Sequence, residues 1–406
     1  MDYALTEEEK LFKNTVHEFC EKYIAPTWIE VDEKKTIPLE LIKKMAENGF
    51  YGIPLSPDYG GLGGTITMAT IATEEVAHAD PAVPIAVYTL LQNGWPYILQ
   101  RYGSEDAKKE ILPRVTKGDA FFGIASTEPQ GGSDVANIRT KATKKGDSWV
   151  VNGEKVHVSG ITEIQRLETG GWYLISRTGT VEEKHRGLSA LAFLARKNGK
   201  TVQGFEPTLF DEIGRFGLST GGFKLTNVEI EDKYRIGEPG KGFYSIVEGF
   251  NVARILVAAA CLGAATWAAE QAIQWLRDRK LYGRSLASLQ GVSFPFADMY
   301  TELEMIRQLI YKAAWLADQI YVHGNPNFSP RDLNIPVAMA KLKAPELAVK
   351  IFEETMKWYG AYGYTKECAL HRGFLGTISY VIGAEGAQNV MRHIIARDTL
   401  GAEHIK

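Results

Sequence analysis

The chain has few cysteines: Cys20, Cys261 and Cys368 are the only three in 406 residues, and they lie far apart. Such scattering excludes the dense disulfide framework of a small secreted domain and fits a reducing compartment. The amino-terminal residues are acidic and helical in pattern, and they lack the basic start and apolar core of a secretory signal. We therefore predict a cytoplasmic protein.

The chain also lacks an excess of positive charge and a long apolar run. Its formal net charge is −3, with 23% charged and 45% hydrophobic residues, which disfavours a phosphate backbone or an anionic lipid surface as a partner. The longest apolar run, residues 255–269, falls short of the roughly 20 residues that cross a bilayer. We predict no nucleic-acid partner, no membrane insertion, and a buried helix at this run.

Two nucleotide-binding motifs are absent, because no GxGxxG follows a predicted strand and no GxxxxGK[ST] occurs. A Rossmann or P-loop enzyme is therefore disfavoured. A metal centre is not indicated either. Cys368 and His371 lie one helical turn apart, but the further ligands of a zinc site are missing from their neighbourhood in the sequence.

What is present is a sequence of three regions. Residues 1–120 have helical spacing, broken at residues 54–64 by a loop with two prolines and four glycines. Residues 121–236 alternate with a period of two, and residues 237–406 return to helical spacing. The predicted fold class is α+β, with an N-terminal helical domain, a middle β-barrel or sandwich domain, and a C-terminal four-helix bundle.

The middle region contains two predicted tight hairpins. Asn152-Gly153 and Asn198-Gly199 each separate two apolar runs, and Asn-Gly is a strong signal for a two-residue hairpin turn. A further alternating segment, residues 221–232, predicts another strand.

The segment TEPQGGSD, residues 127–134, is by itself only a turn. Followed in order by NGEKVHVSG, RKLYGR, WYGAYGY and Glu385-Gly386, it resembles the acyl-CoA dehydrogenase family over nearly the whole chain. The resemblance implies FAD-dependent α,β-dehydrogenation of an acyl-CoA thioester to the 2,3-enoyl-CoA. It also implies a homotetramer and an electron-transferring flavoprotein as redox partner.

The resemblance makes Glu385 the catalytic base. A glutamate before a helix is ordinarily a first-turn residue stabilised by the helix dipole, but Glu385, Gly386 and Arg392 match the family's catalytic segment without a gap. Some relatives carry the base on a bundle helix instead, next to an arginine that matches Arg254. Here that neighbour is Ala253, so Glu385 is the predicted base.

The resemblance also assigns the ligand contacts, and two of the FAD residues, Arg279 and Gln290, would reach the FAD of a neighbouring subunit. The predicted FAD contacts are Ser126, Thr127, His157, Ser159, Arg279 and Gln290. The predicted CoA contacts are Ser133, Phe250, Asn251 and Arg254. Without the resemblance, these would be ordinary strand residues, core aromatics and solvated cations.

Several positions depart from the family pattern. His157 stands where tryptophan or phenylalanine is usual, Lys357 where a glutamine contacts FAD, and Ala387 where threonine is common. Residues 161–173 form an insertion, which either reshapes the ligand channel or is an ordinary surface loop.

Residues 88–97 are expected to contribute to the acyl pocket. Gln92, Asn93 and Trp95 either recognise a ring or a polar branch or simply complete a helix end. From Trp95, His157 and the insertion we predict a cyclic, aryl-substituted or branched acyl-CoA rather than a long linear one. Two alternatives stay open: an acyl-CoA oxidase that uses oxygen, and a nucleic-acid-binding relative without dehydrogenase activity. The second is disfavoured by Glu385 and by the absence of a basic excess.

Overall fold

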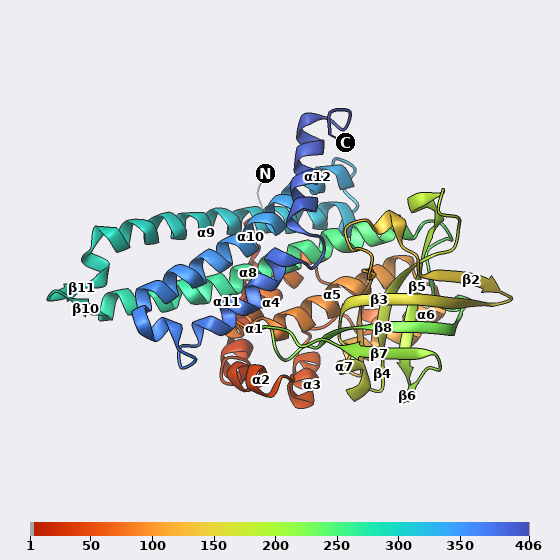
Figure 1. Cartoon of the computed structure of the whole chain (residues 1–406), viewed down its shortest axis with the longest axis horizontal. Helices are drawn as coiled ribbons and strands as arrows, with labels where there is room; N and C mark the ends of the chain where they lie inside the picture. The colour runs from red at the N-terminus through yellow and green to blue at the C-terminus, as the bar shows by residue number, and fades with distance from the viewer. Residues whose placement is uncertain (1–3, 406) are drawn as a thin grey trace.

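The computed structural model describes residues 4–405 and confirms the α+β fold class, with helices, a sheet and a second set of helices in chain order (Figure 1). In Figure 1 the sheet lies at one end, and the long C-terminal helices extend to the other. The N-terminal helices are α1 (Glu7–Tyr23), α2 (Trp28–Lys34), α3 (Leu39–Glu47), α4 (Ile66–Ala79), α5 (Pro84–Tyr102) and α6 (Glu105–Thr116).

Polar caps define where several of these helices begin. The Thr6 hydroxyl accepts from the Glu9 N–H at 3.2 Å, and the Glu9 carboxylate accepts from the Thr6 N–H at 2.8 Å, which is a complete capping box. Ser104 caps α6 by accepting from the Ala107 N–H at 3.1 Å. Between α3 and α4, the predicted loop at residues 54–64 holds only one 3₁₀ turn, Pro57–Tyr59.

The middle region is one mixed sheet of nine strands. They are β1 (Ala120–Ala125), β2 (Lys141–Lys145), β3 (Ser148–Ser159), β4 (Thr169–Arg177), β5 (Leu188–Lys197), β6 (Lys200–Thr201), β7 (Phe205–Leu209), β8 (Thr220–Glu231) and β9 (Arg235–Ile236). The main order is β6-β5-β4-β2-β3-β8-β7, while β1 pairs with β4 and β9 pairs with β5. The pairing of β1 with β4 is parallel.

Only one of the two predicted hairpins exists. Asn198 and Gly199, both with positive φ (50° and 76°), connect β5 to β6 as predicted. The prediction for Asn152-Gly153 is wrong, because both residues lie inside the continuous strand β3. Their register against β8 shifts at this point, and a Cβ on Gly153 would come 2.6 Å from the Thr140 Cα. The glycine therefore serves a bulge and a close approach, not a turn.

The C-terminal region consists of long helices. These are α8 (Gly242–Asp278), α9 (Gln290–Ala317), α10 (Pro330–Tyr359), α11 (Leu370–Ile382) and α12 (Gln388–Leu400). A small hairpin of β10 (Lys280–Leu281) and β11 (Arg284–Ser285) joins α8 to α9 at the projecting tip (Figure 1). Helix α9 continues directly into a π-helical turn, Asp318–Val322.

Helix α8 is the centre of the molecule. The predicted apolar run at residues 255–269 lies within its 37 residues, which makes the helix much longer than the run. By length and composition α8 is the single membrane-span candidate among the described residues, but 89% of its most apolar window is buried inside the protein. It therefore acts as a core helix, against which α4, α5 and α10 pack.

Candidate active site

Glu385 lies on a short turn between α11 and α12. Three consecutive residues of this turn have positive φ: Ala384 at 60°, Glu385 at 46° and Gly386 at 111°. Left-handed conformations are unfavourable for residues other than glycine, so the turn needs support from its surroundings. A Cβ on Gly386 would lie 3.0 Å from the Met391 Cε, which leaves little room for a larger residue there.

Two buried cations supply that support. The Lys341 Nζ, on α10, donates to the carbonyl oxygens of Tyr380 at 3.1 Å, Gly383 at 3.3 Å and Gly386 at 2.6 Å. The Arg254 Nε, on α8, donates to the carbonyl oxygen of Glu385 itself at 2.8 Å. The turn is therefore attached to two helices of the bundle through its backbone, and the Glu385 carboxylate is left for other partners.

The electrostatics of Glu385 have opposing causes. Its side chain is half-buried, and burial raises its pKa above the ordinary value, against the positive charges of Lys341, Arg215 and Arg254. Burial in turn lowers the pKa of Lys341 to about 8 and that of Arg254 to about 10. The result is a carboxylate that holds its proton more tightly than a surface glutamate does.

Lys341 and Arg215 were not predicted from the sequence. Lys341 interrupts an apolar stretch of α10. A lone lysine on an apolar helix face is the sequence signal that could have indicated a buried cation there. Arg215 sits before β8 with a φ of 60° and donates to the hydroxyl of Thr220. Its neighbour Gly214 packs directly on the α11 backbone at Leu375, a long-range contact that no local sequence pattern reports.

The predicted CoA contacts on α8 meet beside this turn. The Asn251 Oδ1 accepts from an Arg254 guanidinium nitrogen at 3.3 Å. The same guanidinium lies over the Phe250 ring, 5.4 Å from its centre. The Trp95 ring of α5 meets Phe250 edge-on, with ring centres 5.8 Å apart. Glu385 therefore shares one neighbourhood with Phe250, Asn251, Arg254 and Trp95.

Gln92, Asn93 and Trp95 are the three acyl-pocket candidates on α5, and the Asn93 side chain is fully hydrogen-bonded within the protein. Its side chain donates to the carbonyl oxygens of Phe50 and Thr89, both at 2.9 Å, and accepts from the Ile53 N–H at 2.7 Å. Of the two interpretations of Asn93, these bonds support the structural one. Within residues 4–405, the Gln92 Nε2 and the Trp95 Nε1 are buried without a hydrogen-bond partner.

Three predicted flavin contacts lie where strands β1 and β3 end. Ser126 and Thr127 follow β1, and the Val156 N–H of β3 donates to the Thr127 carbonyl at 2.9 Å. Ser159 is the last residue of β3, and its carbonyl accepts from the Trp172 indole at 2.9 Å. The hydroxyls of Ser126, Thr127 and Ser159 make no hydrogen bond within the described residues, so they are available to a ligand.

His157 occupies a bulge of β3 with a φ of 56°. Its exposed imidazole meets the Phe210 ring edge-on, with ring centres 5.3 Å apart. The residue therefore points out of the sheet, and it does not contribute to the core.

A buried ion pair holds the TEPQGGSD segment, and sequence reasoning missed it. The Lys155 Nζ lies 2.8 Å from the Glu128 carboxylate and 3.0 Å from the Ser126 carbonyl oxygen. Burial alone would raise the pKa of Glu128, but Lys155 and the N–H groups of Arg139 and Thr140 hold it at about 2. The pair ties the end of β1 to β3.

Three other predicted residues lie on exposed parts of the chain, with no hydrogen bond or ion pair to Glu385 within residues 4–405. Ser133 lies in an exposed stretch ahead of a short 3₁₀ turn. Arg279 ends α8 and Gln290 begins α9, so both lie at the projecting tip of the bundle, and both are exposed.

The insertion at residues 161–173 is not an ordinary surface loop. Ile161, Ile164 and Leu167 are buried, and the Glu163 carboxylate of the short helix α7 (Glu163–Arg166) accepts from Ser219. Arg166 donates to the Thr36 hydroxyl at 2.6 Å and to the Ile37 carbonyl at 3.0 Å. The insertion therefore links the sheet to the N-terminal helices.

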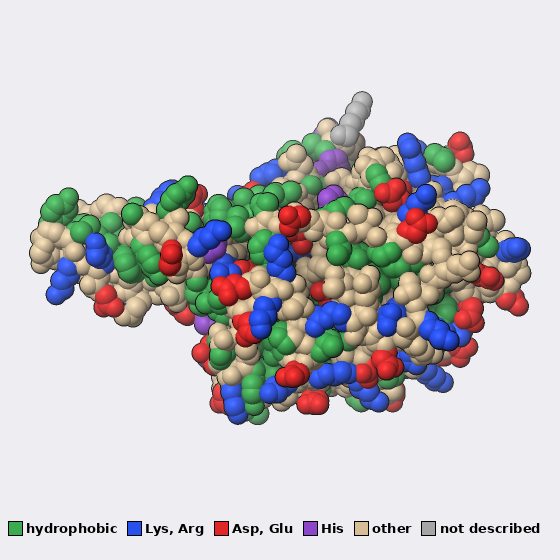
Figure 2. Space-filling model, turned by 60° about the horizontal axis from the view of Figure 1, so that its bottom comes forward, with side chains coloured by type: hydrophobic (Ala, Val, Ile, Leu, Met, Phe, Trp, Pro, Cys, Tyr) green, Lys and Arg blue, Asp and Glu red, His purple; other side chains and the backbone are tan. Residues whose placement is uncertain are grey.

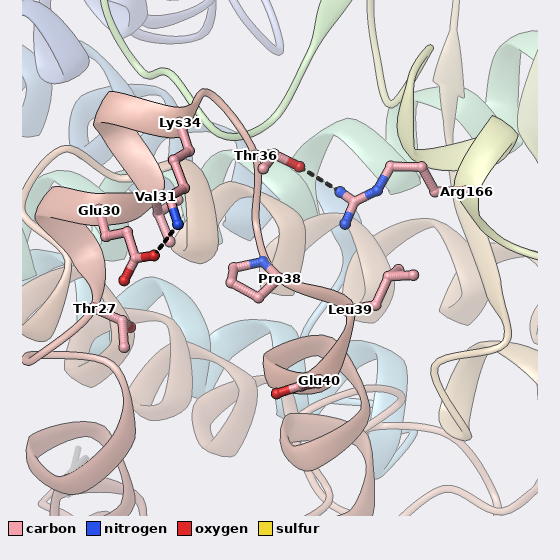
Figure 3. A pocket seen from close by; sticks show the side chains of 9 residues that line it. All are labelled: Thr27, Glu30, Val31, Lys34, Thr36, Pro38, Leu39, Glu40 and Arg166. Atoms are coloured by element: carbon pink, nitrogen blue, oxygen red, sulfur yellow. Dashed lines mark hydrogen bonds and ion pairs between the residues drawn. The ribbon is translucent and has the colours of Figure 1, made fainter.

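Arg166 also lines a hollow of about 520 Å³ beside α2 and α3 (Figure 3). The rest of the lining comes from Thr27, Glu30, Val31, Lys34, Thr36, Pro38, Leu39 and Glu40. None of the predicted site residues is among them, so this hollow is separate from the surroundings of Glu385.

Comparison with known proteins agrees with this three-part structure. Models of the acyl-CoA dehydrogenase N-terminal, middle and C-terminal domains match residues 6–119, 123–228 and 240–400. These matches define the class of protein, an oxidoreductase with a helical domain, a sheet domain and a helical bundle. The chain belongs to the acyl-CoA dehydrogenase family.

Two relatives resemble the chain over nearly its whole length. An acyl-CoA dehydrogenase of Bacillus subtilis is 32% identical over 98% of this chain and 99% of its own. A 3-(aryl)acrylate reductase of Clostridium sporogenes is 28% identical over 97% of this chain and 99% of its own.

Solved structures show the same fold. Glutaryl-CoA dehydrogenase bound to glutaryl-CoA superposes with a TM-score of 0.88 at 30% identity, covering 98% of this chain and 97% of the other. A chain from work on the electron-transferring flavoprotein of Acidaminococcus fermentans has a TM-score of 0.88 at 29% identity, covering 98% and 100%. A Mycobacterium smegmatis glutaryl-CoA dehydrogenase complexed with FADH2 has a TM-score of 0.84 at 23% identity, covering 97% and 94%. All three structures share the fold of this chain.

Proposed function

We propose that this protein is an FAD-dependent dehydrogenase that converts an acyl-CoA thioester to its 2,3-enoyl-CoA, with Glu385 as the base. One observation carries the proposal. The Glu385 carboxylate sits on a turn held by its backbone, beside the α8 face formed by Phe250, Asn251 and Arg254. A glutamate whose backbone is fixed, and whose carboxylate makes no hydrogen bond or ion pair within residues 4–405, suits proton abstraction.

Glu385 would take the proton from the substrate carbon next to the thioester carbonyl. Burial raises its pKa, which brings it closer to the pKa of that carbon acid and makes proton transfer less uphill. The positive charges of Lys341, Arg215 and Arg254 oppose the effect of burial on this pKa and so favour the ionised carboxylate that a base requires.

The residues at the ends of β1 and β3 fit FAD, because Ser126, Thr127 and Ser159 offer three hydroxyls without partners in the described chain. When bound, FAD supplies the acceptor for the hydride that leaves the substrate β-carbon. His157 is exposed and lies two residues before Ser159 in the sequence. Its imidazole would lie against the flavin ring. The ion pair of Glu128 and Lys155 would hold this loop in place.

CoA would lie along α8. Val247, Phe250 and Arg254 are three and four residues apart and so share one helix face. At 1.5 Å per residue this face runs about 10 Å from Arg254 to Val247. Val247 is 37% exposed and Tyr244, three residues nearer the start of α8, is 55% exposed, which leaves an apolar path toward the beginning of the helix, where Lys241 is exposed.

For the acyl group we propose a cyclic, aryl-substituted or branched chain. The Phe250 ring, which meets Trp95 edge-on, lies under the Arg254 guanidinium that bonds the Glu385 backbone, and so offers an aromatic surface to the acyl group; the C. sporogenes relative is named for an aryl substrate. Selectivity for these thioesters over long linear ones is the corresponding expectation.

We further propose a cytoplasmic homotetramer in which Arg279 and Gln290 contact the FAD of a neighbouring subunit, and an electron-transferring flavoprotein as redox partner. Figure 2 shows hydrophobic side chains gathered along the projecting end of the bundle. Among the exposed residues there are Tyr282 at 92%, Phe294 at 61% and Met305 at 65%, and burying such a patch favours association. The three free, buried cysteines fit a reducing compartment.

An anaerobic titration of the FAD-loaded protein tests the function. The oxidised flavin band is followed as linear, branched, cyclic and aryl-substituted acyl-CoAs are added. We expect selective bleaching by one of the last three classes. Fastest bleaching by a long linear chain would overturn the substrate proposal, and stoichiometric peroxide on each aerobic turnover would instead identify an oxidase.

A further inference from the structure

Lys341 is a fully buried lysine with an unusual set of partners. Its side chain is 0% exposed, and all three hydrogen bonds within 3.3 Å go to backbone carbonyls, those of Tyr380, Gly383 and Gly386. An ammonium group has three N–H donors, so these three bonds satisfy it completely. The carbonyls of Gly383 and Gly386 lie on either side of Glu385 in the sequence.

The other buried lysine of this chain shows the contrast. Lys155, also 0% exposed, forms a direct ion pair with Glu128 at 2.8 Å. Lys341 forms no ion pair within residues 4–405. Burying a charge without a directly bonded counter-ion is costly, so a lysine kept in this way needs a use other than stability.

We propose that Lys341 is a positioning residue for the base: its ammonium group clamps the backbone of the 383–387 turn and thereby fixes where the Glu385 carboxylate lies. The inference rests on the proposed role of Glu385. Because the three residues 384–386 all have positive φ, the turn lacks an intrinsic preference for its shape and depends on the clamp. Arg254 holds the carbonyl of Glu385 from the opposite helix.

The surroundings of Lys341 make it electrically coupled to the base. The charged and titratable groups that face it are Glu385 on the turn, Cys261 and Arg254 on α8, and Glu346 on α10. Gln388, at the start of α12, lies 3.5 Å away through its side-chain oxygen. Lys341 is also the strongest of the charges that lower the pKa of Glu385 against burial. Removing its charge should therefore raise the pH at which the base loses its proton.

The test uses the FAD-loaded full-length protein with Lys341→Gln, Lys341→Arg and the control Lys350→Gln. Lys350 lies on the same helix but is exposed, in an ion pair with Glu302. We measure the pH dependence of flavin bleaching at saturating acyl-CoA. For Lys341→Gln we expect a fall of at least about tenfold, since misplacing a catalytic group by 1 Å costs up to about a hundredfold. We also expect the acid limb of the profile to move to higher pH.

Lys341→Arg, which keeps the charge, should keep the acid limb near its wild-type position, and Lys350→Gln should leave both rate and limb unchanged. A purely structural lysine would lower the rate through lost folded protein without moving the limb. A Lys341→Gln profile with unchanged rate and limb overturns the proposal.

A second measurement needs no substrate. Amide hydrogen exchange over residues 383–388 should be at least about tenfold faster in Lys341→Gln than in Lys350→Gln. If Lys341→Gln does not fold, the wild type replaces it: protection of these amides, corrected for intrinsic rates, should fall as the pH rises through about 8, the pKa of Lys341. Unchanged protection would overturn the clamp. Failure of every acyl-CoA to bleach the wild type would count against the proposed function alone.

Discussion

At the scale of single residues, the behaviour of Glu385 follows from groups that never touch its carboxylate. Its backbone carbonyl bonds to Arg254, and the carbonyls on either side of it bond to Lys341. The assignment of Glu385 as the base stays a prediction, which the family resemblance made from the segment Glu385-Gly386. The two cations were not predictable from the sequence, because α8 and α10 bring them from positions 131 and 44 residues earlier in the chain.

Glu385→Gln should remove the base while leaving the shape of the site and the binding of FAD unchanged. The amide is nearly the same size as the carboxylate but cannot accept the proton, so bleaching by acyl-CoA should fall by about 10²–10⁴-fold. Flavin content should stay at the wild-type level, because Glu385 is not among the residues proposed to hold FAD. Stopped-flow absorbance measures the rate, and Glu354→Gln, on the outer part of α10, is the control. A wild-type rate in Glu385→Gln would remove Glu385 as the base.

The pH dependence of bleaching should also reflect Glu385. Since burial raises the pKa of this carboxyl, activity should be lost as the pH falls through a value above that of an ordinary glutamate, near 4.3. The rate measured from pH 4 to 8 at saturating substrate reports it. An acid limb at or below the ordinary value would show that the carboxylate is not desolvated in the working enzyme.

The ion pair of Lys155 and Glu128 makes a separate prediction about stability. Lys155→Met leaves a buried carboxylate without its counter-ion and should lower the unfolding free energy by about 3–5 kcal/mol. The double variant with Glu128→Leu should recover much of that loss. Urea unfolding of both variants and the wild type measures the difference. Equal stability of the single and double variants would mean that the pair is not coupled.

The lowered pKa of the Glu128 carboxyl also predicts how the stability of the protein changes in acid. Its pKa is lowered to about 2, so its contribution is present above the unfolded-state value near 4.3 and is lost as the pH falls from there through about 2. This loss should be absent from the acid-unfolding curve of the double variant.

At the scale of elements, the same dipeptide led to one correct and one wrong prediction. Asn198-Gly199 forms a hairpin turn, while Asn152-Gly153 lies inside β3. The local signal is identical, and the difference is the partner strand. β8 runs along the whole of β3 and pairs on both sides of Gly153, so the ladder keeps the strand extended where a turn would break it.

Helix α11 carries the turn of Glu385, and a glycine sets its position. A Cβ on Gly376 would overlap the carbonyl oxygen of Ala82, just before α5. Gly376→Ala should therefore shift α11 and destabilise the protein by about 1–3 kcal/mol, with a lower bleaching rate. Gly291→Ala is the control, because nothing lies within 4 Å of its added Cβ, and it should be neutral or stabilising by up to about 1 kcal/mol. Equal stability of both variants in urea would contradict the close packing of α11.

At the scale of the whole molecule, the proposed site is divided between the body and the tip. Glu385 and the hydroxyls at the ends of β1 and β3 belong to the body, while Arg279 and Gln290 lie at the exposed tip beside β10 and β11 (Figure 1). One chain does not bring these groups together, which is the expectation if two subunits share each FAD. The domain boundaries 1–120, 121–236 and 237–406 remain a prediction from composition.

The variant Arg279→Ala tests whether two subunits share each FAD site. If Arg279 contacts the FAD of another subunit, the variant should retain less FAD after gel filtration while keeping the wild-type mass in light scattering, expected to be that of a tetramer. Losing a charge-assisted hydrogen bond costs about 1.5–3 kcal/mol, or roughly ten- to a hundredfold in affinity. Arg277→Ala, two residues earlier and also exposed, is the control. A monomeric wild type that binds FAD tightly would refute the shared site.

The sequence by itself determined the α, β, α order of regions, the strand at residues 221–232 and the turn at Asn198-Gly199, because each of these depends on neighbours within a few positions. That Glu385 is the base stays a prediction from the family resemblance. Only the tertiary structure decided how Glu385 is held, that Asn152-Gly153 is a bulge, that Asn93 serves the fold, and that the 161–173 insertion is buried. Those features depend on partners 30 or more positions away, and a local pattern contains no information about which distant backbone or charge will face it.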